Sequence, residues 1–121
     1  MAIPLLICDD SNIARKQVAK SLPVGWDVSI TYASNGLEAL AAIRQGKGEM
    51  VFLDLTMPEM DGFGVLETIR QEDLKSMVIV ISGDIQPVAR ERVLQLGALD
   101  FIKKPVNGDK LRDTLQTYGL L

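Results

Sequence analysis

Carboxylate, hydroxyl and ammonium side chains stand at the ends of four short apolar segments in this 121-residue chain. The first segment is followed by Asp9 and Asp10, another by Asp54, a third ends at Ser82, and a fourth ends at Lys103 and Lys104. If these segments are parallel strands of one sheet, their carboxyl ends meet at one edge, where open α/β sheets bind ligands. All of these side chains then lie along one rim.

Three aspartates close to one another repel, and the repulsion raises their pKa values unless a cation lies among them. Carboxylate oxygens favour a hard cation, and Mg²⁺ suits a site with few carboxylates because it keeps part of its hydration shell. A metal-bound carboxylate beside an ammonium and a hydroxyl can hold a dianionic group. The pattern therefore indicates transfer of a phosphoryl group to an aspartate, with Mg²⁺ and lysine neutralising its oxygens.

Each of these residues also has an ordinary structural interpretation. Two consecutive aspartates after a strand can form a turn and a helix cap, and residues 57–62 can be a simple turn built on Pro58 and Gly62. Two lysines can be a solvated edge. Asp54 differs, because it follows an apolar run in which a buried carboxylate is unfavourable. The joint occurrence of these polar residues at strand ends favours a functional site.

Composition excludes several other chemistries. The chain has one cysteine, Cys8, and no histidine, so it can form neither an internal disulfide, a zinc site, a Cys-His pair nor a Ser-His-Asp triad. The formal net charge of −3 argues against nucleic acid as a partner. The first residues lack the basic start of a signal peptide, and no apolar run approaches the ~20 residues of a membrane span. We therefore expect a cytoplasmic protein.

Apolar segments alternate with amphipathic segments of helical length, which is typical of parallel strand-helix units. The predicted strands are residues 3–8, 27–32, 50–55, 77–82 and 99–103. The predicted helices are residues 11–22, 35–45, 62–71, 86–96 and 107–118. Ser11 and Asn35 are favourable N-caps, and Gly46 and Gly97 are typical of helix ends. Apolar residues at helical spacing predict that Ala14, Val18, Leu22, Leu66, Ile69, Leu111, Leu115 and Tyr118 face the core.

The predicted strands differ in how continuously apolar they are. Residues 5–8, 50–53 and 77–81 are apolar at consecutive positions, so both faces of these strands must be covered. Residues 26–32 and 99–103 alternate or nearly so, which suits edge strands. With right-handed crossovers, the pattern predicts a doubly wound five-stranded parallel sheet in the order 2-1-3-4-5 within one domain.

The sequence resembles the receiver domain of two-component response regulators over essentially its whole length. The matching stretches are residues 6–11, 33–40, 54–62, 80–83 and 97–105. The resemblance implies a flavodoxin-like, CheY-like three-layer sandwich, with a single receiver domain over residues 1–121 and no output domain.

The resemblance also assigns roles to the acidic cluster. It implies that Asp54 is the phosphoacceptor and a Mg²⁺ ligand. Asp10 is then a direct Mg²⁺ ligand, Asp9 a ligand through water, and the backbone carbonyl of Thr56 a further ligand.

Further roles follow from the same resemblance. Lys104, but not Lys103, contacts the phosphoryl group, and the peptide bond between Lys104 and Pro105 is cis. The hydroxyl of Ser82 moves toward the phosphoryl group, and the ring of Phe101 turns into the space that it leaves. The alternative is that Phe101 is an ordinary core or edge aromatic.

Two positions vary within the family and tune the lifetime of the phosphoryl group, and here they are Thr56 and Asp84. Asp84 adds negative charge near the mouth of the pocket, where it either orients a water for hydrolysis or repels an anionic donor.

The implied function is a phosphorylation switch, not an enzyme. A histidine kinase or His phosphotransfer protein donates the phosphoryl group, and a target protein binds the surface of the fourth helix, fifth strand and fifth helix. Chemotaxis is one possible pathway, and the protein is a monomer or a phosphorylation-dependent dimer. Arg15 and Lys16 either dock an acidic donor or form a solvated basic face.

Two other classes of protein are alternatives. A phosphatase or phosphotransferase with an Asp nucleophile would act on small molecules, but enzymes of the haloacid dehalogenase type carry a second Asp where this chain has Thr56. A flavodoxin-like flavin carrier needs a phosphate-binding loop after the first strand, and Asp9 and Asp10 would repel a phosphate there.

Overall fold

The computed structural model describes residues 2–83 and 86–121, which form five strands and five helices in alternation. The strands are β1 (Ile3–Cys8), β2 (Val28–Ala33), β3 (Met50–Leu53), β4 (Met77–Ser82) and β5 (Asp100–Lys103). The helices are α1 (Asn12–Lys20), α2 (Gly36–Arg44), α3 (Gly62–Gln71), α4 (Pro87–Gln95) and α5 (Gly108–Thr117).

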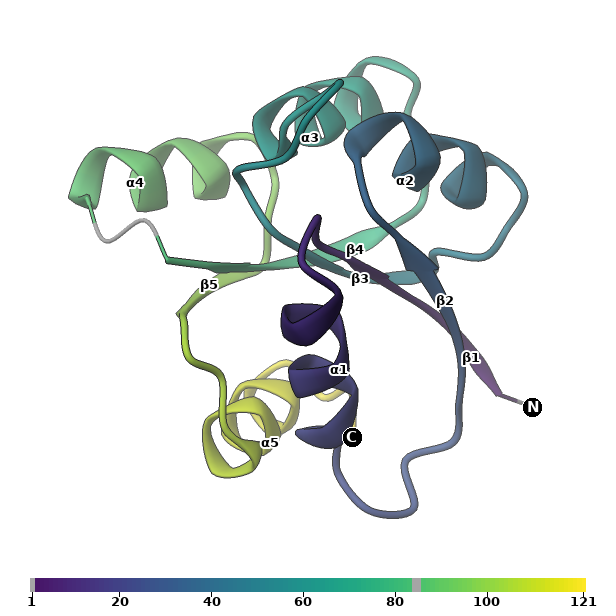
Figure 1. Cartoon of the computed structure of the whole chain (residues 1–121), viewed down its shortest axis with the longest axis vertical. Coiled ribbons are helices and arrows are strands. Elements are labelled where there is room, and N and C mark those ends of the chain that lie inside the picture. Colours follow the sequence, from purple (N-terminus) through teal and green to yellow (C-terminus); the bar gives the residue numbers. More distant parts are fainter. Residues whose placement is uncertain (1, 84–85) are drawn as a thin grey trace.

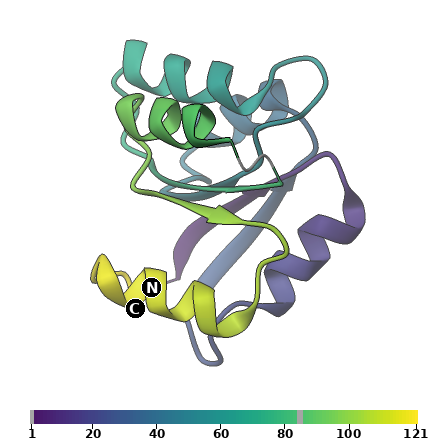
Figure 2. The same cartoon turned by 90° about the vertical axis from the view of Figure 1, so that its left-hand side faces the viewer.

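The strands form one parallel sheet in the order β2-β1-β3-β4-β5, which confirms the predicted topology. Helices α2, α3 and α4 cover one face of the sheet, and α1 and α5 cover the other (Figures 1 and 2). The chain reverses its winding direction between β1 and β3, so the carboxyl ends of these two strands form the crevice expected of a doubly wound sheet.

Each face of the sheet has its own apolar core. The core beneath α2, α3 and α4 includes Val51, Leu53 and Val80. The core beneath α1 and α5 includes Leu5 and Phe52, together with side chains of α5. The interior strands are apolar at consecutive positions because they contribute to both cores, whereas the edge strand β2 exposes Ser29, Ile30 and Tyr32.

Local capping explains four of the five helix starts. The side chains of Ser11, Asn35, Asp61 and Asn107 each accept a hydrogen bond from a backbone N–H in the first turn of their helix. Helix α1 ends at Lys20, two residues before the predicted end, because Pro23 disfavours helical geometry at the residue before it.

The predicted core positions are confirmed in part: Leu66 of α3 is buried, whereas Ile69 is only partly buried. Leu111 and Leu115 of α5 are fully buried, but Tyr118 is 39% exposed, because it lies beyond the last helical residue, Thr117. Ala14 and Leu22 are only partly buried, and of the predicted stripe on α1 only Val18 is buried. No described helix is long and apolar enough to cross a membrane.

Candidate functional site

Three carboxylates converge at the carboxyl ends of β1 and β3. One oxygen each from Asp9, Asp10 and Asp54 lies within 4.8 Å of the others. Asp9 and Asp54 are 4% and 6% exposed, whereas Asp10 is exposed. The structure therefore brings together the acidic residues that the sequence placed on one rim.

Lys104 supplies the cation of this cluster. Its Nζ donates a hydrogen bond to Oδ2 of Asp9 at 2.7 Å and lies 3.4 Å from Oδ1 of Asp54. The backbone N–H of Lys104 donates to the carbonyl of Ser82 at 2.9 Å, which holds the lysine beside β4. The Lys104–Pro105 peptide bond is cis, as the resemblance implies, and Lys103 is exposed.

The cluster carries more negative than positive charge. Burial and the charge of Asp9 raise the pKa of Asp54, and Lys104 offsets this only in part. Burial acts to lower the pKa of Lys104, but its hydrogen bond to Asp9 and the charges of Asp54 and Asp9 outweigh burial and raise it. Three carboxylates with one ammonium fit a divalent cation with oxygen ligands, because such an ion would compensate the remaining charge.

The turn between β1 and α1 orients Asp9. Its Oδ1 accepts a hydrogen bond from the backbone N–H of Ser11 at 2.9 Å, and its carbonyl accepts one from Nη1 of Arg15 at 2.6 Å. Arg15 therefore supports the turn that carries the acidic pair, while Lys16 is exposed. Sequence reasoning missed this contact of Arg15, because nothing in the spacing shows where the guanidinium points.

The loop after β3 is folded back onto Asp54. The backbone N–H of Gly62 donates to the carbonyl of Leu55 at 2.9 Å. A Cβ at Gly62 would collide with the carbonyl oxygen of Asp54 and lie 2.9 Å from Cα of Leu55. Glu59 has φ of 67° in this loop. The sequence indicated a turn here, but the close approach that requires glycine at position 62 is a tertiary contact.

An open cavity of about 470 Å³ lies above the cluster. Its lining residues are Asp10, Asp54, Thr56, Ser82, Gly83, Gln86 and Lys104. Ser82 is 1% exposed and Phe101 is 8% exposed, but Phe101 packs in the core beneath α4 and does not line this cavity. Gln86 was not predicted, and Asp84, predicted to tune the site, lies outside the described residues.

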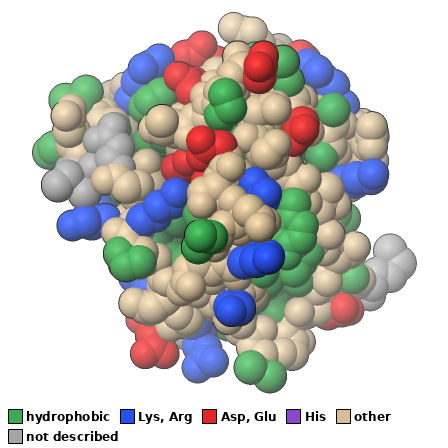
Figure 3. Space-filling view, viewed as in Figure 1, with side chains coloured by type: hydrophobic (Ala, Val, Ile, Leu, Met, Phe, Trp, Pro, Cys, Tyr) green, Lys and Arg blue, Asp and Glu red, His purple; other side chains and the backbone are tan. Residues whose placement is uncertain are grey.

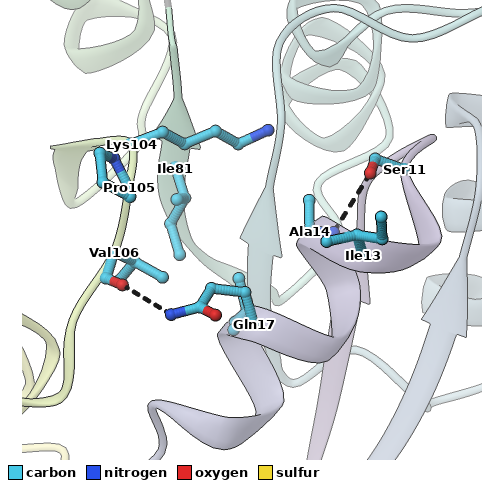
Figure 4. A pocket seen from close by; sticks show the side chains of 9 residues that line it. Ser11, Ile13, Ala14, Gln17, Ile81, Lys104, Pro105 and Val106 are labelled. Atoms are coloured by element: carbon cyan, nitrogen blue, oxygen red, sulfur yellow. Dashed lines mark hydrogen bonds between the residues drawn. The ribbon is translucent and has the colours of Figure 1, made fainter.

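A larger groove of about 570 Å³ lies on the other side of Lys104, between α1 and the segment after β5 (Figure 4). Its walls are mostly apolar and include Ile13, Pro105 and Val106, and at one end Nε2 of Gln17 donates to the carbonyl of Val106 at 3.3 Å. Basic side chains gather on the surface over α1, which carries Arg15, Lys16 and Lys20 (Figure 3).

Solved structures share the fold of this chain. The receiver domain of the putative response regulator NarL from Mycobacterium tuberculosis is 26% identical, with a TM-score of 0.86 over 97% of this chain and 95% of that one. CheY in the CheX-CheY-BeF3-Mg²⁺ complex from Borrelia burgdorferi is 30% identical, with a TM-score of 0.86 over 97% of this chain and 89% of that chain.

The family follows from the sequence comparisons. The model of the response regulator receiver domain matches residues 5–116, so this chain belongs to the receiver domain family of two-component signalling. The chemotaxis protein CheY of Bacillus subtilis is 32% identical over 115 residues, which are 95% of this chain and 96% of that protein. Members of this family are signalling switches that take phosphoryl groups from histidine kinases.

Some relatives are much longer. A protein-glutamate methylesterase/protein-glutamine glutaminase of Geobacter sulfurreducens is 38% identical over 107 residues, which are 88% of this chain but only 29% of that protein. The shared part is thus the receiver, and the named activity resides in a protein with further sequence outside the matched part.

Proposed function

We propose that this receiver accepts a phosphoryl group on Asp54 from the phosphohistidine of a histidine kinase or His phosphotransfer protein, and signals by protein contact. The observation that carries the proposal is the position of Asp54, buried in an acidic cluster with the ammonium of Lys104 3.4 Å from its Oδ1. The 121 residues contain no histidine, so the donor imidazole lies outside them.

The transfer needs an oxygen nucleophile and compensation of charge. A carboxylate oxygen of Asp54 attacks the phosphorus, the P–N bond breaks, and the imidazole nitrogen keeps the electron pair. The ammonium of Lys104 stabilises the negative charge on the phosphoryl oxygens. The hydroxyl of Ser82, at the end of the neighbouring strand, provides a further hydrogen-bonding group.

Asp9, Asp10, Asp54 and the backbone carbonyl of Thr56 would hold Mg²⁺. When bound, this ion neutralises charge on the carboxylates and on the phosphoryl oxygens. The acidic cluster supports this assignment, and the related CheY of Borrelia burgdorferi was solved in a complex that contains Mg²⁺ and BeF3.

The groove beside α1 is a suitable dock for the donor. Lys104 lines both this groove and the cavity above Asp54, so a helix seated in the groove would bring its phosphohistidine close to the acceptor. Ile13 is 80% exposed at the groove, and the basic residues of α1 favour an acidic donor surface.

The output is proposed to run through Ser82 and Phe101 to the surface formed by α4, β5 and α5. Phe101 lies in β5 and packs in the same core as Ala89 and Val93 of α4, so a rotation of its ring would change the packing of that helix. Chemotaxis is a candidate pathway because CheY proteins are among the relatives. Tuning by Thr56 and Asp84, a phosphorylation-dependent dimer and a cytoplasmic location stay predictions.

Incubation with acetyl phosphate and Mg²⁺ tests the function. We expect intact-protein mass spectrometry to show the addition of one phosphoryl group, lost in Asp54→Asn and kept in Asp113→Asn, which changes an exposed aspartate of α5. No adduct in the parent protein, or an adduct that persists in Asp54→Asn, would refute the proposal. Sustained turnover of many substrate molecules would instead support a small-molecule phosphatase.

A further inference from the structure

The guanidinium of Arg15 in α1 points to the turn that precedes its own helix. Nη1 donates a hydrogen bond to the carbonyl of Asp9 at 2.6 Å, and Nη2 donates to Oδ1 of Asn12 at 3.3 Å. Arg15 is half-buried, whereas its neighbour Lys16 is exposed. The planar fork of an arginine holds two acceptors at once in a fixed arrangement. Arg15 therefore connects two points of the turn, on either side of Asp10.

All four polar groups of Asp9 have partners. Its backbone N–H donates to the carbonyl of Ala33 at 3.0 Å, and its carbonyl accepts from Arg15. Its two carboxylate oxygens accept from the backbone N–H of Ser11 and from Nζ of Lys104. Because Asp9 lies beyond the last residue of β1, Arg15 supplies the donor that a neighbouring strand would otherwise give to the carbonyl. Asp9 is thus fixed through its backbone as well as its side chain.

The side chain of Asp10 has no comparable support. It is exposed, and within residues 2–83 and 86–121 its carboxylate forms no hydrogen bond or salt bridge. One of its oxygens nevertheless lies within 4.8 Å of oxygens of Asp9 and Asp54. The carbonyl that Arg15 contacts belongs to the peptide unit between Asp9 and Asp10, and a peptide unit is planar. A donor that fixes this carbonyl therefore also fixes the direction in which the chain enters Asp10.

We infer that Arg15 is a positioning residue for the metal site. By holding the plane of the peptide unit between Asp9 and Asp10, it keeps the carboxylate of Asp10 directed at the acidic cluster before a cation binds. The inference deepens the proposed function and rests on it, since Mg²⁺ is the ion assigned to these carboxylates. Groups that orient metal ligands through hydrogen bonds commonly change metal affinity by about 10- to 100-fold when they are removed.

The charge of Arg15 and its orienting contact act on Mg²⁺ binding in opposite directions. The charge reaches neighbouring groups: hydrogen bonds from the backbone N–H and hydroxyl of Ser34 lower the pKa of Glu38, and the charge of Arg15 acts in the same direction. A cation beside the cluster repels a second cation, so removing the charge alone would tighten Mg²⁺ binding. A loss of affinity on removing Arg15 therefore reports lost orientation and not lost charge.

Isothermal titration calorimetry of the full chain with magnesium chloride, at constant ionic strength, tests the inference. We expect Arg15→Met to weaken Mg²⁺ binding by about tenfold or more. Arg15→Lys should lie between this variant and the parent, because an ammonium keeps the charge but cannot hold two acceptors in a planar fork. The matched control Lys16→Met removes the same charge from an exposed position of the same helix, so its affinity should be unchanged or slightly tighter. No donor protein is present, so docking does not enter this measurement.

A second measurement follows the turn without metal. The backbone N–H of Ser11 donates to Oδ1 of Asp9 at 2.9 Å, so its hydrogen exchange in chelator, measured by NMR, reports how often the turn opens. We expect faster exchange in Arg15→Met than in the parent or in Lys16→Met. Asn12→Ala removes the second acceptor of the guanidinium and should weaken Mg²⁺ binding by a smaller factor. Circular dichroism establishes that each variant is folded.

The outcomes separate this inference from the proposed function. If the parent binds Mg²⁺ and folded Arg15→Met binds it equally or more tightly, the inference alone fails. Equal losses of affinity in Arg15→Met and Lys16→Met would also overturn it, because Lys16 does not contact the turn. If the parent does not bind Mg²⁺, the inference and the metal assignment of the proposed function fail together. If the affinities follow the expected order but Asp54 accepts no phosphoryl group, the proposed function alone fails.

Discussion

Nζ of Lys104 lies 2.7 Å from Oδ2 of Asp9, although 95 residues separate the two in the sequence. The same ammonium lies 3.4 Å from Oδ1 of Asp54. Lys104 thereby connects the ends of β1 and β3 to the segment after β5. The three carboxylates are consequently not equivalent. Asp9 has a cation and a backbone N–H as partners. Asp54 is also buried, but its negative charge is less fully compensated, and its pKa is raised.

Neutralising Asp54 should stabilise the protein when no metal is present. In chelator, we expect Asp54→Asn to raise the melting temperature by a few degrees, roughly 1 kcal/mol. The substitution removes a carboxylate whose charged form is disfavoured by burial and by the charge of Asp9. Asp10→Asn should act in the same direction but less, since Asp10 is exposed. Asp9→Asn should lower the melting temperature, because Lys104 loses its partner. Equal or lower melting of Asp54→Asn relative to the parent would contradict the crowding of charges.

Removing Lys104 should have the opposite effect on stability. Lys104→Met leaves Asp9 and Asp54 buried without their cation, so we expect a loss of about 1–3 kcal/mol in urea unfolding with chelator present. The matched variant Lys103→Met removes the same charge from an exposed position and should cost less than about 0.5 kcal/mol. If both variants lose the same free energy of unfolding, the contacts of Lys104 with Asp9 and Asp54 contribute nothing to stability.

Gly62 is required by packing against the backbone of β3. Gly62→Ala would place a Cβ against the carbonyl of Asp54 and 2.9 Å from Cα of Leu55, so we expect a loss of about 1–3 kcal/mol in urea unfolding. Gly108→Ala is the control, because its Cβ would meet only the Ser21 carbonyl at 3.6 Å. A near-neutral Gly62→Ala would show that the loop after β3 adapts easily.

Stability should fall at alkaline pH because of Cys8. Burial, followed by the charges of Asp9 and Asp54, raises the pKa of its thiol from 9.0 to about 12. The unfolded chain therefore releases this proton first, and stability should fall by about 1.4 kcal/mol per pH unit between pH 9 and about 12. Urea unfolding across this range, compared with Cys8→Ala, isolates the contribution, and parallel curves for the two proteins would refute it. The native thiol should also resist alkylation at pH 8.

Much of the fold could be predicted because its signals are local. Continuous apolar runs such as 77–81 mark strands covered on both faces, and the N-caps Ser11 and Asn35 mark helix starts whatever the tertiary context. The ends of strands are harder to predict, because hydrogen bonding to the neighbouring strand decides them. The third strand was predicted to reach Leu55, but its ladder with β1 ends at Leu53, because the chain then turns back toward Gly62.

The candidate site was predictable only as a set of strand ends. The order of the strands implies that Asp9, Asp54 and Lys104 converge, since parallel strands end at one edge. It does not show that Gln86 lines the cavity above Asp54, or that Arg15 supports the carbonyl of Asp9. These contacts depend on how a loop or a side chain bends after its element ends.

The sequence by itself determined the alternation of strands and helices, the order of the sheet and the acidic rim, because hydrophobic periodicity and capping act over a few residues. Only the tertiary structure decided which charges are paired. Lys104 meets Asp9 and Asp54 whereas Lys103 is exposed, because consecutive residues at the end of a strand point in different directions. Charge compensation in this protein therefore depends on contacts between segments that lie far apart along the chain.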